Sequence, residues 1–304
     1  MGTPPAAVKS LEKLLRDGHE IVAVYTQPDR PVGRHGHTLK FSPVKEFALE
    51  NSLPVFQPVK IKTPEALETF RSHNADIAVV VAYGRILPES FLHSFLNGAI
   101  NVHFSLLPKY RGAAPVNWAI VNGEKVTGVT TMIMDIGLDT GDILLQRETE
   151  IGPEETSPEL MDRLAVLGAE LLSETLVKVE TLAAIEQDPG EATLAPIMKK
   201  EDGIIDWNMP AGEINNRVRG FQPFPTAYTF YSGKRLIVWK AQLVDSGTSG
   251  NAGQVLEAHG ETLSVLCGEN SVLQLVEVQI EGKRRMNVRD FLNGVKVQVG
   301  EKLG

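Results

Sequence analysis

An amide and an imidazole two residues apart are the side chains of this chain best placed to do chemistry. Asn101 and His103 lie in residues 100–115, a stretch that opens with a short apolar run. Successive side chains of a β-strand point to opposite faces, so residues two apart point the same way. We therefore expect both side chains to emerge at one site. The residues up to Gly112 then break regular structure, as a chain does when it leaves a sheet to form a ligand pocket.

A second polar cluster, residues 134–142, offers a carboxylate partner for the histidine, Asp139. A histidine titrates near neutral pH, a carboxylate can orient it, and an amide can donate to a developing oxyanion. Together these groups suit acyl transfer to a nitrogen nucleophile. The pattern alone fits equally well a histidine buried in the core and an aspartate in a surface turn, neither of them catalytic.

Two other kinds of chemistry are weaker interpretations. Ser105 is a conceivable nucleophile, but the chain has no G-x-S-x-G elbow around a serine. His35 and His37 lie in a glycine-containing loop with no third ligand nearby, so we expect no metal site. The first glycine loop, at Gly2, is not G-x-G-x-x-G, and nothing here indicates a dinucleotide.

The elements that must position these residues alternate between strand and helix. Helical spacing ends at Gly18, and the pairs Ser42–Pro43 and Thr63–Pro64 are typical helix starts. Strands are predicted at 20–26, near Val55 and at 76–82. This alternation predicts an α/β fold with a doubly wound, mostly parallel sheet.

The pattern lacks the first strand of that sheet. Gly2 to Pro4 reads as the turn of a βα unit, which a strand should precede, and the first strand of such folds normally lies centrally. We therefore expect a native N-terminal strand to be absent. A different segment in the central position would contradict this expectation.

The remainder of the chain consists of the end of the first domain, a linker and a β-rich part. A helix over 112–122, a strand over 126–134 and a long amphipathic helix over 157–185 complete the first part. A short helix around Ile214 and five short strands separated by glycine turns predict a small barrel of the oligonucleotide-binding kind. The predicted bounds are a catalytic domain at 1–186, a linker at 187–203 and a barrel at 204–304.

Composition limits the class of protein. The chain has 304 residues, 42% of them hydrophobic, and a formal net charge of −8, which argues against a general nucleic-acid coat protein. No apolar run approaches the roughly 20 residues of a membrane helix, and no signal peptide follows Met1, so a cytoplasmic protein without membrane contact is expected. The single cysteine, Cys267, is predicted to be a buried structural thiol. No exposed heptad favours a dimer, and we expect a monomer.

Six stretches together carry a resemblance to a known family. They are MGTP at Met1, TQPDRPVGR from Thr26, SPVK from Ser42, VVVAYGRILP from Val79, and the pair INVHFSLLPKYRGAAP and GLDTGD. The chain resembles the folate-dependent formyltransferases from Met1 across the second domain. QPDRPVGR and GLDTG favour those members that act on tRNA.

The resemblance implies a catalytic trio, a formyl donor and a formyl acceptor. Asn101, His103 and Asp139 match the catalytic positions, and the co-substrate would be 10-formyltetrahydrofolate, with no metal. The formyl group would pass to the α-amine of initiator methionyl-tRNA, for translation initiation. The residues implied in folate binding are Arg85, Ile86, Leu87, Ser105, Leu106, Leu107, Pro108, Asp135 and Gly137.

Basic residues provide the tRNA contacts that the resemblance implies. The loop that would reach the acceptor stem carries Arg34 and Lys40, and the further tRNA-binding candidates are Lys199, Lys200 and Arg284. Such turn clusters are also common as solvated tips. The alternative is an N-formyltransferase for an amino sugar nucleotide with the same donor, and a non-enzymatic RNA-binding protein is a further one.

Overall fold

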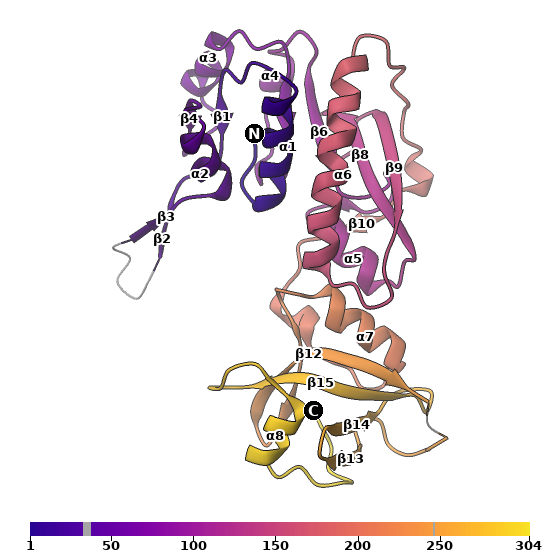
Figure 1. Ribbon diagram of the computed structural model, residues 1–304. Coiled ribbons are helices and arrows are strands. Elements are labelled where there is room, and N and C mark those ends of the chain that lie inside the picture. Colours follow the sequence, from indigo (N-terminus) through magenta and orange to yellow (C-terminus); the bar gives the residue numbers. More distant parts are fainter. Residues whose placement is uncertain (33–37, 246) are drawn as a thin grey trace. The chain divides into compact units, whose positions relative to one another are not determined.

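The computed structural model describes residues 1–32, 38–245 and 247–304 and contains two compact units (Figure 1). The first unit consists of Met1–Pro115, Val126–Glu150 and Met161–Ala195, and the second of Val116–Lys125, Ile151–Leu160 and Pro196–Gly304. The predicted bounds at 186 and 203 stay a prediction. The two units are described separately below.

Two helices of the first unit begin at the Ser42–Pro43 and Thr63–Pro64 pairs that the sequence predicts as helix starts. Ser42 Oγ accepts a hydrogen bond from the Lys45 amide at 3.0 Å, and Thr63 Oγ1 accepts one from the Ala66 amide at 3.2 Å. Each cap satisfies one of the free amide groups of a helix start. The helices are α1 (Pro5–Arg16), α2 (Pro43–Glu50), α3 (Pro64–Ser72) and α4 (Glu89–Leu92).

The strands of this unit form a mixed arrangement. Short parallel strands β1 (Val24–Tyr25) and β4 (Val55–Phe56) pair, and a separate four-stranded sheet has the order β5-β6-β8-β9. Its members are β5 (Ala78–Val80), β6 (Ala99–His103), β8 (Val126–Ile133) and β9 (Ile143–Glu150). The β5–β6 pair is parallel, whereas β6–β8 and β8–β9 are antiparallel.

Three details differ from the sequence prediction. The strand expected over 20–26 is limited to Val24–Tyr25, β9 was not anticipated, and the long helix α6 (Ser157–Lys178) ends well before residue 185. From Leu145 onward, the residues of β9 alternate between half-buried and exposed. The strand therefore has no run of buried apolar residues by which the sequence could reveal it. A β-ribbon of β2 (Arg30–Val32) and β3 (Thr38–Lys40) also lies in this unit.

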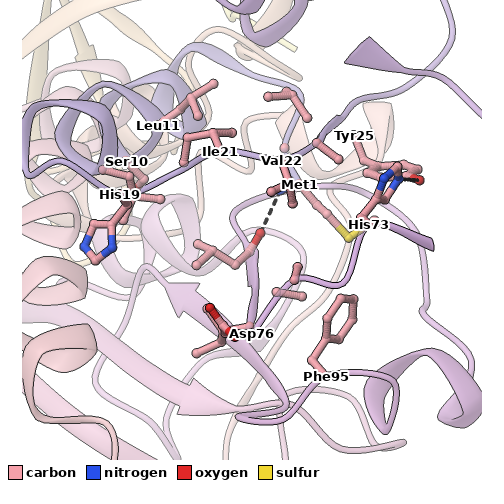
Figure 2. A pocket seen from close by; sticks show the side chains of 18 of the residues that line it. Met1, Ser10, Leu11, His19, Ile21, Val22, Tyr25, His73, Asp76 and Phe95 are labelled. Atoms are coloured by element: carbon pink, nitrogen blue, oxygen red, sulfur yellow. Dashed lines mark hydrogen bonds between the residues drawn. The ribbon is translucent and has the colours of Figure 1, made fainter. Parts of the chain in front are cut away.

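The central position of the sheet is a slot rather than a strand. Among the described residues, β1 pairs only with β4, and β5 pairs only with β6 apart from a bridge to Gly2. Figure 2 shows the space around Met1, which residues 19–25 and 73–79 line. The strand expected to be missing is thus not replaced by another described segment.

Residues expected to form a linker carry structure of their own. A 3-10 turn η1 (Pro189–Glu191) precedes β10 (Leu194–Ala195), which pairs in parallel with β7 (Arg111–Gly112). The segment then continues into η2 (Lys200–Gly203). Residues 194–195 are therefore part of the first unit's framework.

The second unit is an antiparallel sheet with helices. Its path is β11-β12-β15-β14-β13, with β16 (Met286–Asn287) beside β15. The strands are β11 (Ala227–Tyr231), β12 (Lys234–Val244), β13 (Val255–His259), β14 (Thr262–Leu266) and β15 (Val272–Ile280). The helices here are α5 (Pro115–Val121), which starts at the last residue of the first unit, α7 (Ala211–Gly220) and α8 (Val288–Gly294), the last of which was not anticipated.

The chain's last residues link the two outer strands of this sheet. The Val255 amide of β13 donates to the Glu301 carbonyl at 2.8 Å, and the Gly304 amide donates to the Phe230 carbonyl of β11 at 3.0 Å. Among the described residues, β11 and β13 share no direct ladder, so strand pairing does not close the predicted barrel; residues 301–304 bond to both outer strands instead.

Apolar side chains fill both units. The sheet of the second unit packs around Ile214, Val218 and Phe291, and Cys267 belongs to this core, where burial raises the pKa of its thiol to about 12. This confirms the predicted structural thiol. Of the helices in the described residues, none combines the length and apolarity needed to cross a bilayer.

Candidate functional site

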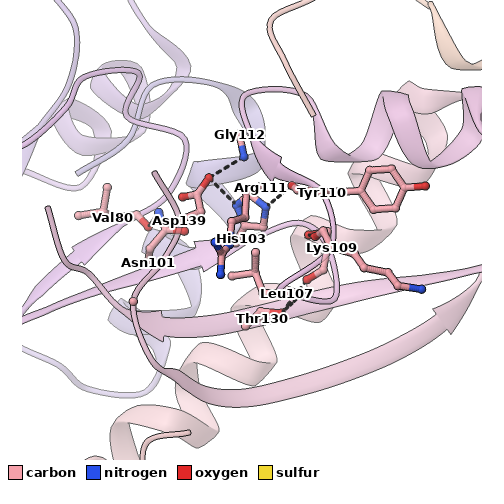
Figure 3. Close-up of polar contacts among 12 residues, drawn as sticks. Val80, Asn101, His103, Leu107, Lys109, Tyr110, Arg111, Gly112, Thr130 and Asp139 are labelled. Atoms are coloured by element: carbon pink, nitrogen blue, oxygen red, sulfur yellow. Dashed lines mark hydrogen bonds and ion pairs between the residues drawn. The ribbon is translucent and has the colours of Figure 1, made fainter. Parts of the chain in front are cut away.

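Strand β6 positions the amide and the imidazole. It lies between β5 and β8, with Asn101 opposite Val80 and His103 opposite Thr130. Both side chains reach the same region together with Asp139 (Figure 3). The alternation expected along a strand is confirmed.

The imidazole of His103 is held in one orientation. His103 is 6% exposed, and its Nε2 lies 2.9 Å from the Tyr110 carbonyl oxygen. Because a carbonyl oxygen can only accept, we assign the proton of the neutral ring to Nε2. Nδ1 is then free to accept a proton, and it lies 3.7 Å from Asp139 Oδ2. That separation is too long for a direct hydrogen bond.

Asp139 is fixed by backbone contacts in the loop between β8 and β9. Its Oδ2 accepts a hydrogen bond from the Gly112 amide at 2.8 Å, and its own φ is 53°. Its side chain is 17% exposed. A positive φ is uncommon outside glycine and is tolerated best by Asp and Asn. The structure thus brings the carboxylate of Asp139 close to the imidazole of His103, as expected, but without a direct hydrogen bond between them.

Asn101 has one satisfied end and one free end. Its Nδ2 donates to the Val80 carbonyl at 3.1 Å, whereas Oδ1 is buried without a hydrogen-bond partner among the described residues. An unsatisfied buried acceptor costs about 1–3 kcal/mol. A ligand with an N–H donor would remove that cost.

The loop after β6 is held by a threonine. Thr130 Oγ1 donates to the Ser105 carbonyl at 2.7 Å and accepts from the Leu107 amide at 3.1 Å. Ser105 is fully buried, and its Oγ donates to the Lys109 carbonyl at 2.7 Å. Ser105 Oγ therefore braces the loop rather than pointing to solvent.

Leu106, Leu107 and Pro108 complete this loop. Leu107 is buried beside Met132 and Ile143, and Leu106 packs over Gly128, where a Cβ would lie 2.5 Å from Leu106 Cδ2. Residues 105–108 stay predicted folate contacts.

Arg85, Ile86 and Leu87 follow β5 and differ in exposure. Arg85 donates to Gln27 Oε1 at 3.0 Å and to the Val59 carbonyl at 2.7 Å, so its guanidinium is already engaged. Ile86 is 71% exposed and Leu87 is 4% exposed. Ile86 is the one member of this group that presents an apolar side chain to solvent.

The loop of Asp135 and Gly137 is a tight turn. Asp135 Oδ1 accepts from the Gly137 amide at 3.0 Å and from Thr140 Oγ1 at 2.8 Å. A Cβ at Gly137 would lie 1.8 Å from Thr140 Oγ1, so only glycine fits. Ile136 and Leu138 of this turn are 70% and 60% exposed. Apolar side chains this open are a surface on which an aromatic ring can pack.

The predicted tRNA contacts lie on the surface where described. Lys40 is at the end of β3, Lys199 and Lys200 are at η2, and Arg284 is in the turn before β16; all four are exposed. Arg34 lies outside the described residues, as do His35 and His37. No group of three or more His, Cys, Asp or Glu side chains able to hold a metal occurs in the part of the chain that the structure describes.

Sequence reasoning missed a supporting residue, Gln187. It is 5% exposed although it was placed in a linker, and its amide contacts both Arg111 and the loop of Asp139. Its neighbours Glu186 and Asp188 are exposed. A lone glutamine in a polar stretch carries no periodic signal, so the sequence offered none that could have found it.

Family comparison covers both units. A model described as formyl transferase matches residues 1–176, and one described as formyl transferase, C-terminal domain, matches residues 197–296. Two similar relatives are the methionyl-tRNA formyltransferases of Solibacter usitatus (strain Ellin6076) and Koribacter versatilis (strain Ellin345). They are 52% and 53% identical over 306 residues, covering all of this chain and 97% of each relative.

A solved structure shares the fold. It is the crystal structure of an N-formyltransferase from Helicobacter canadensis in complex with folinic acid and dTDP-3-aminofucose. The TM-score is 0.67 at 20% sequence identity, and the match covers 90% of this chain and 96% of the other. At this identity the likeness concerns the fold alone.

Proposed function

Because the chain belongs to the formyl transferase family, we propose that it transfers the formyl group of 10-formyltetrahydrofolate to the α-amine of initiator methionyl-tRNA. The product would be N-formylmethionyl-tRNA for translation initiation. Relatives of this name match the full length of the chain at about half identity, which supports the acceptor. The H. canadensis enzyme, with folinic acid bound, supports a folate donor.

One observation from the site carries this proposal most directly. Asn101 Oδ1, His103 Nδ1 and Asp139 Oδ2 are all hydrogen-bond acceptors, and the first has no described partner. Three acceptors at one place fit a group that brings N–H donors. An amine nucleophile that must lose a proton is such a group.

The reaction balances with these three side chains. The amine nitrogen forms a bond to the formyl carbon, and the bond from that carbon to N10 of the folate breaks. Asn101 Nδ2 has a second N–H, beyond the one given to Val80, that can donate to the oxyanion. His103 Nδ1 takes the amine proton, and Asp139 stabilises the resulting imidazolium. N10 of the leaving folate takes up a proton.

Apolar surface supports the predicted folate residues. Ile86, Ile136 and Leu138 are exposed apolar side chains, and Ile86 lies within the predicted set. A flat pterin ring gains stability from such contacts. We assign to Arg85 and Leu87 a role through their backbone, because the guanidinium of Arg85 is engaged and Leu87 is buried.

Exposed basic residues support contact with tRNA. Lys40, Lys199, Lys200 and Arg284 would neutralise phosphates, and Arg34 is the fifth predicted contact. Each neutralised phosphate releases counterions, so tRNA affinity should fall steeply with salt. A charge-neutral variant of Lys199 and Lys200 should flatten that dependence. An affinity that stays constant between low and moderate salt would contradict this surface.

Formyl transfer from labelled 10-formyltetrahydrofolate tests the function. Initiator methionyl-tRNA should be formylated, and elongator methionyl-tRNA and an amino sugar nucleotide should be poor acceptors. Preferred transfer to the amino sugar would establish the alternative function instead. We propose in addition that the protein is a cytoplasmic monomer, and light scattering of the purified chain measures its mass in solution.

A further inference from the structure

The side-chain amide of Gln187 uses every hydrogen-bonding position that it has. Its Nε2 donates to the Asp139 carbonyl at 3.0 Å and to the Gly141 carbonyl at 2.7 Å. Its Oε1 accepts from Arg111 Nε at 3.0 Å and from Arg111 Nη2 at 2.7 Å. A primary amide has two N–H donors and an oxygen with two lone pairs, so none is left unused. Gln187 therefore ties the loop of Asp139 to the chain at Arg111.

Arg111 lies between the two backbone groups that hold the reacting side chains. The Tyr110 carbonyl oxygen is 2.9 Å from His103 Nε2, and the Gly112 amide donates to Asp139 Oδ2 at 2.8 Å. Figure 3 shows this tripeptide beside the imidazole and the carboxylate. A displacement of the tripeptide would therefore move the supports of both side chains.

The segment that carries Gln187 is anchored on both sides of it. Ile185 pairs with Ile143, the first residue of β9, through two hydrogen bonds of 2.8 and 2.9 Å. On the other side, the carbonyl and the Oγ1 of Thr193 accept from the backbone amides of residues 111 and 110, each at 2.8 Å. The amide of Gln187 is thus held at a fixed place between β9 and the tripeptide.

Truncation of Gln187 removes the donor of two carbonyl groups at once. Gln187 is 5% exposed, whereas Glu186 and Asp188 on either side of it are exposed. Buried backbone carbonyl groups need a hydrogen-bond partner, so those of Asp139 and Gly141 must find new donors when the amide is gone. The loop that carries them would move to reach these donors, and the carboxylate of Asp139 would move with it.

The separation of Asp139 from His103 is sensitive to such a movement. The 3.7 Å between Oδ2 and Nδ1 is about 0.5 Å beyond the upper end of the usual hydrogen-bond range, which is about 3.2 Å. The attraction between a carboxylate and an imidazolium falls as their distance grows, and it is stronger in a buried site than in water. A misplacement of about 1 Å can cost on the order of 10²-fold in rate.

We infer that Gln187 is a positioning residue for formyl transfer, whose amide sets the distance between Asp139 and His103. This inference rests on the proposed function. Gln187 acts by holding the loop of Asp139 against the backbone at Arg111, and its effect on the reaction passes through the carboxylate. It should therefore govern turnover rather than the binding of either substrate.

Gln187→Ala, with Glu186→Ala as the exposed matched control, tests this role in the full chain. Formylation of initiator methionyl-tRNA is measured over a range of 10-formyltetrahydrofolate and tRNA concentrations. The kcat of Gln187→Ala should fall on the order of 10- to 100-fold, with little change in either KM. The control should keep the wild-type kcat.

A double variant shows whether the effect passes through Asp139. In an Asp139→Ala background, Gln187→Ala should lower kcat by less than about threefold, because both substitutions act on the same interaction with His103 and their effects are then not additive. A role in the general stability of the fold would instead give the same factor in both backgrounds.

Gln187→Glu separates the two ends of the amide. The new carboxylate keeps two acceptors for Arg111, and the guanidinium beside it favours the charged form. It has no N–H for the carbonyls of Asp139 and Gly141. The kcat of Gln187→Glu should therefore fall at least as far as that of Gln187→Ala, although the contact with Arg111 is preserved.

The outcomes distinguish this inference from the function itself. Additive losses in the double variant, or a wild-type kcat for Gln187→Ala or Gln187→Glu, would overturn the positioning role while formylation by the wild-type chain stands. A wild-type chain that does not formylate methionyl-tRNA would instead overturn the proposed function. All rates are measured well below the lowest melting temperature of the set, so that a lower kcat reports on folded enzyme.

Discussion

The sheet differs on the two sides of β6, the side of β8 and the side of β5, which are called its two flanks below. On one flank, β8 and β9 extend the sheet, and loops from residues 105–112, 135–141 and 187–195 are tied together by hydrogen bonds around the site. On the other flank, Met1 and Gly2 are the only described residues that pair along the free edge of β5. The chemistry is therefore held by distant segments on one side, while the support on the other side is an open slot.

The two flanks meet at the backbone of β5. Val79 and Val81 bond to Met1, and the carbonyl of Val80 between them accepts from Asn101 Nδ2. A shift of β5 toward the slot would move the acceptor that orients Asn101. Variants on each flank can now show whether the flanks act independently.

The largest effect is expected for His103→Ala. It removes the side chain proposed to take the amine proton, and general acid–base assistance is worth roughly 10² to 10⁴ in rate. The turnover number should fall by that factor with little change in melting temperature, measured by formyl transfer and calorimetry. His19→Ala, at an exposed histidine, is the matched control. Turnover within a factor of a few of wild type would rule out the assigned role.

Asn101→Ala should cost somewhat less, about 10²-fold in the turnover number, as expected for one lost oxyanion donor. The Val80 carbonyl loses its partner at the same time. Raising the donor concentration should not restore turnover, because the loss lies in the transition state. Full rescue at high donor concentration would place Asn101 in ground-state binding instead.

Gly112→Ala should disturb both stability and rate. Gly112 has φ 123°, and a Cβ there would lie 2.6 Å from the Ala195 carbonyl oxygen. The strain of such a residue is of order 1–3 kcal/mol, and the shifted amide would release Asp139. Gly98→Ala is the matched control, because Gly98 has φ 68° with nothing within 4 Å of its Cβ position. Equal melting temperatures and rates for both variants would contradict the close approach at Ala195.

The smallest effect concerns the slot and its pH dependence. The Met1 amine has a folded pKa of about 5 against 8.0 when free, so the unfolded chain binds a proton that the folded chain does not. Stability should therefore rise as pH increases from 5 to 8. His19, Glu20, His73 and Asp76 also line the slot. The comparison is therefore the Nα-acetylated chain, which has no amine charge but keeps one N–H to donate to the Val79 carbonyl. Melting curves that run parallel for both forms would show that the amine is not desolvated.

Local signals in the sequence were sufficient to predict several helix starts and to place Asn101 and His103 on one face of a strand. Ser42 and Thr63 are caps whose side-chain oxygens act within three residues, and Asn101 and His103 share a face because a strand has a period of two. These features depend on neighbours along the chain.

Long-range contacts were beyond what the sequence could decide. Three contacts join residues far apart in the chain. Gln187 bonds to the loop of Asp139, Thr130 bonds to Ser105, and Gly304 bonds to Phe230 of β11. Their side chains carry no periodic signal, because a single buried polar contact leaves none. The sequence alone determined which groups could react; only the tertiary structure decided which backbone atoms hold them, because those contacts exist only after distant segments pack.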